Sequence, residues 1–185
     1  IFIFILGSWT YKKLQRELET IQSEELKTTL LSNKGALELW INEQKKIGKT
    51  LSNVQLLKSS VEHLVSKYGQ GKDSPNLIIR KDTVLLELNS WLEPILSSED
   101  IHVYSVLDKT GFRIASNNLE MVGKQLPQAD VNNLLPVFTD TIATFTPPTG
   151  ALSTDSAHAR NKKFVWIDVP ILDSHKKVIA TFGFG

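Results

Sequence analysis

The sequence predicts an α+β protein, in which a long N-terminal helix precedes a domain with a central antiparallel sheet of about five strands flanked by helices. Three observations lead to this prediction. Residues 8–68 contain no proline, and their apolar side chains recur at intervals of three and four. Residues 101–117 alternate apolar and polar side chains on both sides of a turn that ends at Gly111. Residues 163–173 and 178–184 are two further runs of strand type.

The composition excludes two classes of site. The chain has a net charge of +1, and its basic and acidic side chains are interleaved, so it lacks the basic stripe typical of nucleic-acid binding. It contains no cysteine, which rules out disulfides, thiolate nucleophiles and cysteine-based metal sites. No nucleic-acid partner is therefore expected.

The first residues have the pattern of a membrane boundary. Residues 1–6 are large and apolar, and Trp9, Tyr11, Lys12 and Lys13 follow, as aromatic and basic residues do where a span meets the headgroups. A complete span needs about 20 apolar residues, so residues 1–9 are interpreted as the truncated end of a transmembrane helix. This interpretation makes the membrane a partner. A buried strand and the end of a signal peptide are the alternatives.

Residues 10–68 are predicted to form one long stalk helix, either unbroken or broken at Gly35 or Gly48. A seven-residue apolar stripe runs along its second half: Trp40, Ile47, Val54, Val61 and Tyr68. An unbroken helix of this length would be longer than one small domain covers, so its first half is expected to pair with a second copy and form a homodimer. A helical hairpin folded on itself is the alternative.

The remaining elements follow in order. Residues 69–75 hold glycines and a proline and predict a linker, and residues 82–96 predict a second helix capped by Asp82 or Thr83. After the hairpin, residues 119–126 are predicted as a loop, residues 130–138 as a short helix that Pro136 interrupts, and residues 141–146 as a strand. A polar loop over residues 149–163 precedes the last two strands, where Pro170 implies an edge or a bulge.

Chemistry-bearing residues do not converge in the sequence. The histidines His63, His102, His158 and His175 are spread over a predicted helix, strand, loop and turn, whereas metal sites need three or four ligands together. Asp155, Ser156 and His158 lie too close in one loop to form a hydrolase triad. No catalytic residue, metal or cofactor is predicted, and the fragment is not expected to be an enzyme.

In this order the elements resemble the Cache family of extracytoplasmic sensor domains, which have a PAS-like fold and occur in chemoreceptors, histidine kinases and nucleotide cyclases. The resemblance rests on residues 103–117 (VYSVLDKTGFRIASN), 121–126 (MVGKQL), 144–150 (TFTPPTG) and 166–184 (WIDVPILDSHKKVIATFGF). No single motif is specific, but their order is, and with the long helix they cover almost the whole chain. The resemblance implies that residues 69–185 form a PAS-like sensor domain facing the periplasm or the cell exterior.

Cache receptors for amino acids carry an Arg-x-Trp-Tyr group after the MVGKQL-like piece and two aspartates for the ammonium group. In the first region this chain has Gln128, Ala129, Asp130 and Val131, and Thr146 and Gly185 stand at about the aspartate positions. Because a carboxylate needs cationic or several N–H donors, the resemblance does not predict an α-amino acid bound in the usual way.

The PAS-like pocket implied by the resemblance lies between the sheet and its crossing helices. Candidate ligand contacts are the polar or aromatic residues on the strands: Tyr104, Arg113, Ser116, Thr146, Trp166 and Asp168. The alternatives are a core or dimer aromatic for Trp166, and a solvated face or an ion pair for Arg113 and Asp168. Ligand identity is not predicted.

The expected function is ligand sensing by a membrane-bound signalling receptor, in which a small molecule shifts the sheet and the long helix. A ligand-free dimerisation or interaction module of a membrane protein is the alternative, and an interior without a ligand-sized cavity would favour it. A membrane-tethered enzyme is a third class, against which the lack of convergent catalytic groups argues.

Overall fold

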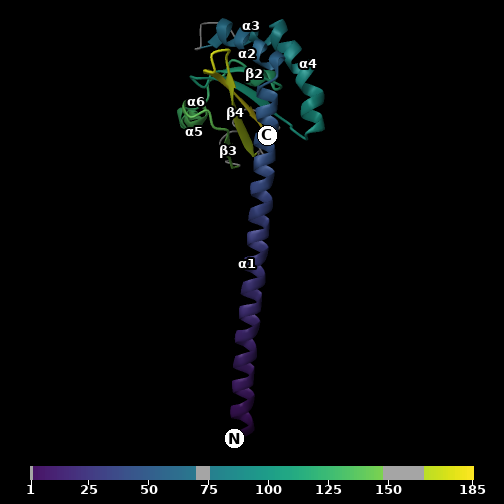
Figure 1. Cartoon of the computed structure of the whole chain (residues 1–185), viewed down its shortest axis with the longest axis vertical. Helices are drawn as coiled ribbons and strands as arrows, with labels where there is room; N and C mark the ends of the chain where they lie inside the picture. Colours follow the sequence, from purple (N-terminus) through teal and green to yellow (C-terminus); the bar gives the residue numbers. More distant parts are fainter. Residues whose placement is uncertain (1, 70–75, 148–164) are drawn as a thin grey trace. The chain divides into compact units, whose positions relative to one another are not determined.

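The structure is a computed structural model that describes residues 2–69, 76–147 and 165–185. The chain divides into two compact units, residues 1–42 and 43–185. Helix α1 (Phe2–Ser52) makes up the first unit and continues into the second as residues 43–52 (Figure 1). The predicted division at residue 69 stays a prediction, as does the interpretation of residues 1–9. Within the described residues, no helix has a stretch long and apolar enough to cross a membrane.

The predicted break in the long helix is at the wrong place. Helix α1 runs through both Gly35 and Gly48, and the break comes at Asn53 and Val54, before α2 (Gln55–Tyr68). A single glycine costs a helix only about 1 kcal/mol, which flanking helix formers offset. Val54 instead has extended backbone angles, and its N–H bonds to the carbonyl of Leu51 in a tight turn.

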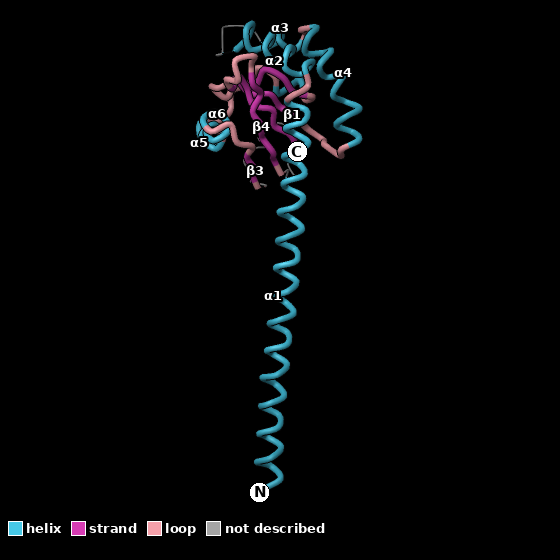
Figure 2. Tube along the Cα trace, viewed as in Figure 1, coloured by secondary structure: helices cyan, strands magenta, loops and turns pink. Residues whose placement is uncertain are grey.

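The described residues contain a single sheet of five antiparallel strands in the order β2-β1-β5-β4-β3, shown in magenta in Figure 2. The strands are β1 (Tyr104–Asp108), β2 (Arg113–Ser116), β3 (Thr144–Thr146), β4 (Trp166–Leu172) and β5 (Val178–Phe184). The predicted α+β fold class, with its sheet of about five strands, is confirmed.

The central hairpin forms as predicted. Gly111 has a φ of +82°, which glycine adopts without steric cost. Asp108 closes the turn, because its Oδ1 accepts hydrogen bonds from the N–H groups of Thr110 at 2.8 Å and Phe112 at 3.0 Å. The hairpin thereby fixes the register of β1 and β2.

Pro170 lies where the sheet has an open edge. In the described part of the chain, β3 pairs only with residues 166–168 of β4, so the outer edge of β4 is uncovered at Pro170. Proline has no N–H and is tolerated there because no partner requires one. A bulge follows between Ile171 and Leu172.

One face of the sheet is covered by α2, α3 (Asn76–Arg80) and α4 (Thr83–Ser98). Helix α4 begins as predicted, with Asp82 Oδ1 accepting from the Val84 N–H at 2.9 Å. The α2 residues of the predicted stripe, Val61 and Tyr68, are buried in this core. The second half of the stripe therefore packs inside the domain.

The opposite face is covered by α5 (Gln128–Asn133) and α6 (Leu135–Thr139), which Figure 1 shows across the strands from α4. These are two short helices in place of the predicted single one, since Pro136 lies in the first turn of α6, where its missing N–H costs nothing. They are held by a small cluster of buried residues: Leu107, Leu126, Val131 and Leu134.

The predicted polar loop of residues 149–163, with Asp155, Ser156 and His158, lies outside the described residues, as does most of the predicted linker.

Candidate functional site

Strand β4 divides its side chains between two covered faces. Ile167, Val169 and Ile171 are buried in the core under α2 and α4. Trp166 and Asp168 alternate with them and so project from the other face, toward α5 and α6. Both faces of this strand are therefore covered by helices, and only the second one carries polar groups.

A small cavity lies on that second face. Its volume is about 20 Å³, which is room for roughly one water molecule. Eight residues line it: Leu107, Leu126, Asp130, Asn133, Leu134, Thr146, Trp166 and Asp168. The structure thus brings together three of the six predicted contacts, namely Thr146, Trp166 and Asp168.

Asp168 is the most unusual residue of the cavity. Its side chain is 1% exposed, and Oδ1 accepts a hydrogen bond from Trp166 Nε1 at 3.2 Å. Oδ2 is buried and has no hydrogen-bond partner among the described residues. Burial raises the pKa of Asp168 to about 7, and the polar groups of Trp166 and Thr181 offset this only in part. The carboxyl group therefore exchanges its proton near neutral pH.

The strands around Asp168 leave space for its carboxyl group. Asp168 lies between Gly183 on β5 and Thr144 on β3. A Cβ at Gly183 would overlap the Asp168 carboxylate and lie 2.6 Å from Trp166 Nε1. The hydroxyl of Thr144 is also buried without a hydrogen-bond partner among the described residues. Because Gly183 has no side chain, the hydrogen-bonded side chains of Trp166 and Asp168 fit beside it. Any other residue at this position would displace them.

Helix α5 supplies two polar lining residues that the sequence did not single out, Asp130 and Asn133. They lie in the segment where the resemblance places a ligand-binding group, and Asp130 was considered only as a departure from the Arg-x-Trp-Tyr pattern. Their place in this segment is the sequence signal that could have identified them as site residues. Gly111 places this helix, because a Cβ there would overlap Val131 of α5.

Tyr104 and Ser116 do not reach the cavity. Tyr104 faces the opposite core, where its ring lies 5.7 Å from that of Phe182 and its hydroxyl donates to Asn89 Oδ1. Burial raises the pKa of Tyr104, so it stays protonated. The Ser116 hydroxyl donates to the Tyr104 carbonyl at 2.7 Å. Both residues have partners within the fold.

Arg113 lies on the same face as Asp168 but far from it. Its Cα partner is Leu107 on β1, and three strand spacings separate β2 from β4, about 14 Å in all. The guanidinium donates to the Met121 carbonyl at 3.4 Å, and burial lowers the pKa of Arg113. Its Nε has no hydrogen-bond partner among the described residues. Arg113 does not line the cavity.

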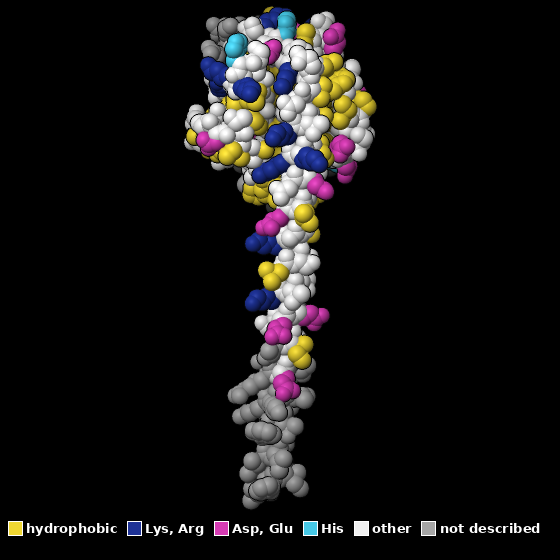
Figure 3. Space-filling model, in the orientation of Figure 1, with side chains coloured by type: hydrophobic (Ala, Val, Ile, Leu, Met, Phe, Trp, Pro, Cys, Tyr) yellow, Lys and Arg dark blue, Asp and Glu magenta, His cyan; other side chains and the backbone are white. Residues whose placement is uncertain are grey.

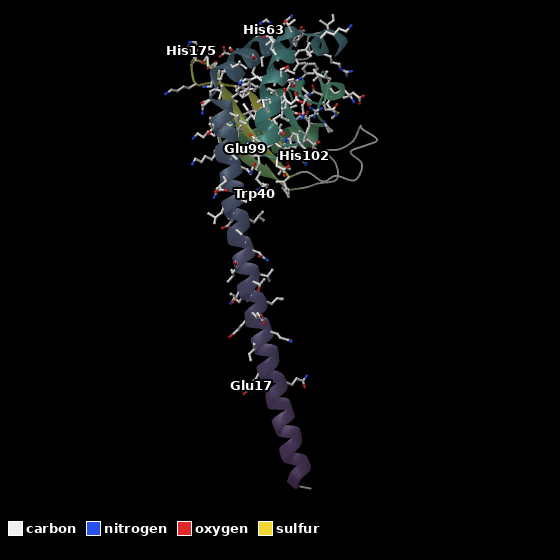
Figure 4. All side chains as sticks on the ribbon, turned by 90° about the vertical axis from the view of Figure 1, so that its right-hand side faces the viewer. Glu17, Trp40, His63, Glu99, His102 and His175 are labelled. Atoms are coloured by element: carbon white, nitrogen blue, oxygen red, sulfur yellow. The ribbon has the colours of Figure 1, made fainter. Side chains whose placement is uncertain are left out.

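No group of three or more potential metal ligands occurs among the residues that the structure describes. Figure 4 labels His63, His102 and His175, which come from α2, from the segment before β1 and from the β4–β5 turn. All three are exposed. The cavity itself is lined by one buried acid, one indole, hydroxyl and amide groups, and leucines.

Comparison with solved structures identifies the fold. The E. coli DcuS sensor domain superimposes with a TM-score of 0.51 at 13% sequence identity, over 78% of this chain and 85% of that chain. The chain has the fold of a sensor domain. This agrees with the predicted Cache resemblance, and at this identity the likeness concerns the fold alone.

The V. cholerae histidine kinase DctB sensor domain is a second, weaker match to this sensor-domain fold. The TM-score is 0.40 at 13% identity, over 80% of this chain, which spans about half (54%) of that structure. No protein-family model and no curated protein sequence matches the chain.

Proposed function

We propose that the chain is the extracytoplasmic sensor domain of a membrane-bound signalling receptor, and that it binds a small molecule in the cavity lined by Thr146, Trp166 and Asp168. The fold supports this proposal, since it is shared with a protein described as a sensor domain. The observation that carries it is Oδ2 of Asp168, which has no hydrogen-bond partner among the described residues although its side chain is 1% exposed.

A buried carboxyl oxygen without a partner is costly and needs a reason. Burying a polar group without a hydrogen bond costs roughly 1–3 kcal/mol on protein scales, and most buried polar atoms in proteins are paired. A perturbed carboxyl on a cavity is a candidate for binding, because a ligand would supply the missing partner. An apolar residue at this position would serve packing better.

The cavity is too small for a ligand in this structure. Ligand pockets usually measure about 300–1,000 Å³, far more than the present 20 Å³. Binding therefore requires α5 and α6 to move away from the sheet. Among the described residues, α5 and α6 are held there by the small cluster of Leu107, Leu126, Val131 and Leu134, by Phe138 packed against it, and by the buried Val137. A ligand would stabilise an open state to the extent that it binds this state better.

Strand β4 offers a route from the cavity to the long helix. Val169 follows Asp168 directly and lies on the other face, against Gly48 of α1. Phe184 on β5 contacts the same glycine, so α1 lies close against both strands. Because α1 is continuous through Gly48, a shift of β4 on ligand binding would displace this helix. This is the relay that we propose.

The first unit has a surface that suits a second copy of the chain. Figure 3 shows hydrophobic side chains between charged ones along α1. Four of them follow coiled-coil spacing and are highly exposed: Leu26 (67%), Leu30 (62%), Leu37 (52%) and Trp40 (40%). Asn33 continues the same spacing and is exposed too. We propose that this seam, Leu26, Leu30, Asn33, Leu37 and Trp40, pairs with its copy in a homodimer.

A ligand-free dimerisation module is the second candidate, and the small volume of the cavity favours it. A thermal-shift screen of the purified chain against amines, organic acids, sugars and nucleobases separates the two. Sensing predicts that at least one compound raises the melting temperature of the wild type and has a weaker effect on Trp166→Ala. If no compound stabilises the wild type, or if the effect survives in Trp166→Ala, the proposed site is wrong.

A further inference from the structure

The charged residues that line the cavity in the described part of the chain are both acidic. Asp130 and Asp168 both line it, and no lysine or arginine is among its lining residues in the described part of the chain. Among the described residues, Arg113 is the arginine on the same sheet face; it lies three strands away on β2 and donates to a backbone carbonyl. Among the described residues a ligand carboxylate would meet like charges and no cationic donor, which disfavours acidic ligands.

The remaining lining groups also suit a cation. Trp166 lines the cavity and donates through its indole N–H to the Asp168 carboxyl group, and the faces of an indole ring attract ammonium groups. Thr146 and Asn133 add a hydroxyl and an amide, whose oxygens accept hydrogen bonds from N–H donors. Three leucines, Leu107, Leu126 and Leu134, provide apolar contact for a carbon chain.

The position of Asp168 gives the second, independent indication. The residue is 1% exposed, and its Oδ2 lacks a partner among the described residues. Oδ1 accepts from Trp166 Nε1, and the Thr181 hydroxyl is a further polar neighbour of the carboxyl group, so Oδ2 keeps acceptor capacity for a ligand. A group that donates hydrogen bonds and carries positive charge would satisfy it completely.

From these features we infer that the ligand of this cavity is a small organic amine, whose protonated ammonium group binds Asp168 Oδ2 and lies against the indole of Trp166. This inference rests on the proposed function and names the class of its ligand. It also assigns the acidic anchor to Asp168 on β4, whereas the resemblance implies aspartates at about the positions of Thr146 and Gly185.

Binding by such a contact depends on pH. Asp130 is the other titratable group on the cavity, and the neighbours of Asp168 on β3 and β5 are neutral: Thr144, Thr181 and Gly183. Alkylammonium groups stay charged below pH 9, so Asp168 sets the profile. With its pKa at about 7, the affinity for an amine should fall about tenfold from pH 8 to pH 6.

The test uses probes that share a carbon skeleton and differ in charge. The purified 185-residue chain is titrated with n-butylammonium, 1,4-diaminobutane, butyrate and butanedioate at constant ionic strength, by thermal shift and calorimetry. The variants are Asp168→Asn, which keeps an acceptor for Trp166, and Asp140→Asn. Asp140 is exposed and does not line the cavity, so its variant removes one negative charge elsewhere.

Support consists of stabilisation by one or both amines and by neither acid, with affinity reduced about tenfold or more in Asp168→Asn and unchanged in Asp140→Asn. If an acid stabilises the chain and the amines do not, the ligand class is overturned while the sensor proposal stands. If Asp168→Asn and Asp140→Asn lose affinity for the amines equally, the effect comes from the overall charge of the protein. This outcome also overturns the inference. If neither the four probes nor the wider screen stabilises the chain, both proposals fail.

Discussion

Asp168 and Val169 are consecutive residues of β4 whose side chains lie on opposite faces of the sheet, Asp168 on the cavity and Val169 against Gly48 of α1. A movement of the strand at one of them is a movement at the other, because the backbone between them is a single peptide unit. In the proposed function this pair joins the ligand to the long helix.

The first prediction concerns the pH dependence of stability. The pKa of Asp168 is about 7 in the folded chain, whereas an unfolded aspartate titrates near 3.9. Between these values the folded state holds a proton that the unfolded chain has lost, so the free energy of unfolding falls as pH rises. Asp168→Asn lacks this term. Its stability relative to wild type should increase by about 2–3 kcal/mol from pH 5 to pH 8.

Urea denaturation at several pH values measures the free energy of unfolding of the wild type and of Asp168→Asn. The other carboxyl groups are the same in both proteins, so their contributions cancel in the difference. If the difference in free energy of unfolding between the two proteins is the same at every pH from 5 to 8, the pKa of Asp168 is not raised.

The second prediction concerns the contact of α1 with the sheet. A Cβ on Gly48 would lie 2.7 Å from Phe184 Cε1 and 2.9 Å from Val169 Cγ1. Gly48→Ala should therefore destabilise the chain by about 1–3 kcal/mol through overpacking. Gly35→Ala is the matched control in the same helix, because nothing lies within 4 Å of its Cβ. It should be stabilising by about 0.5–1 kcal/mol. Equal effects in thermal denaturation would refute the close packing at Gly48.

The third prediction concerns the space beside Asp168. In Gly183→Ala the new methyl group would overlap the Asp168 carboxylate and approach Trp166 Nε1, at a cost of about 1–3 kcal/mol. The cost should be smaller when Asp168→Ala is also present, because one of the two colliding groups is gone. A double-mutant cycle by urea denaturation measures the coupling. Strictly additive penalties would place the new methyl group away from Asp168.

The fourth prediction concerns the start of α4. Asp82 caps this helix through Val84, and its Oδ2 accepts hydrogen bonds from Tyr68 and Lys67, both at 2.7 Å. Asp82→Ala should cost about 1–3 kcal/mol at pH 7. Asp82→Asn should cost less, because its carbonyl oxygen can still cap the helix. Lys67 is half-exposed, so its ion pair adds little.

The contribution of Asp82 to the free energy of unfolding also depends on pH. Burial raises the pKa of Asp82, but the hydrogen bonds from Lys67, Tyr68 and the Val84 amide outweigh it, and the net pKa is lowered. The stabilisation is thus present above the unfolded pKa and is lost as pH falls through the folded one. The gap between wild type and Asp82→Ala should narrow at acid pH. An unchanged gap at pH 3 would contradict this assignment.

The fifth prediction concerns the homodimer. Leu30→Glu and Leu37→Glu place charges in the proposed seam and should shift the chain from dimer to monomer in sedimentation velocity. Leu39→Glu is the matched control. Leu39 is 69% exposed but lies outside the seam spacing, so its variant should remain dimeric. A wild-type chain that is monomeric, or a Leu39→Glu variant that dissociates equally, would rule out this seam.

The strands were predictable because their signals are local. Alternation in residues 101–117 together with Gly111 predicted the hairpin, and Asp82 predicted the start of α4. The end of α1 was not predictable in this way, since Asn53 and Val54 carry no strong breaker. The turn there depends on packing of the following helix, in which Leu57 and Leu64 are buried.

The candidate site was predictable only in part. Strand alternation assigns residues to two faces, but helices cover both faces of this sheet, so the pattern does not tell which face holds the cavity. Tyr104 therefore ranked with Trp166 and Asp168, although it packs against Phe182 in the other core. Asp130 was missed because its helix is placed on the sheet by tertiary contacts, which no local pattern encodes.

The central claim, that a small molecule enters the cavity beside Asp168, is tested most directly by NMR of the indole N–H groups. The Trp166 resonance is assigned from its loss in Trp166→Phe, and the chain is titrated with n-butylammonium and 1,4-diaminobutane at pH 8. Trp166 Nε1 bonds to Asp168, so its resonance should move saturably, while that of Trp91 on α4 should not. A Trp166 resonance that stays in place with both amines and with every compound of the wider screen would contradict the claim.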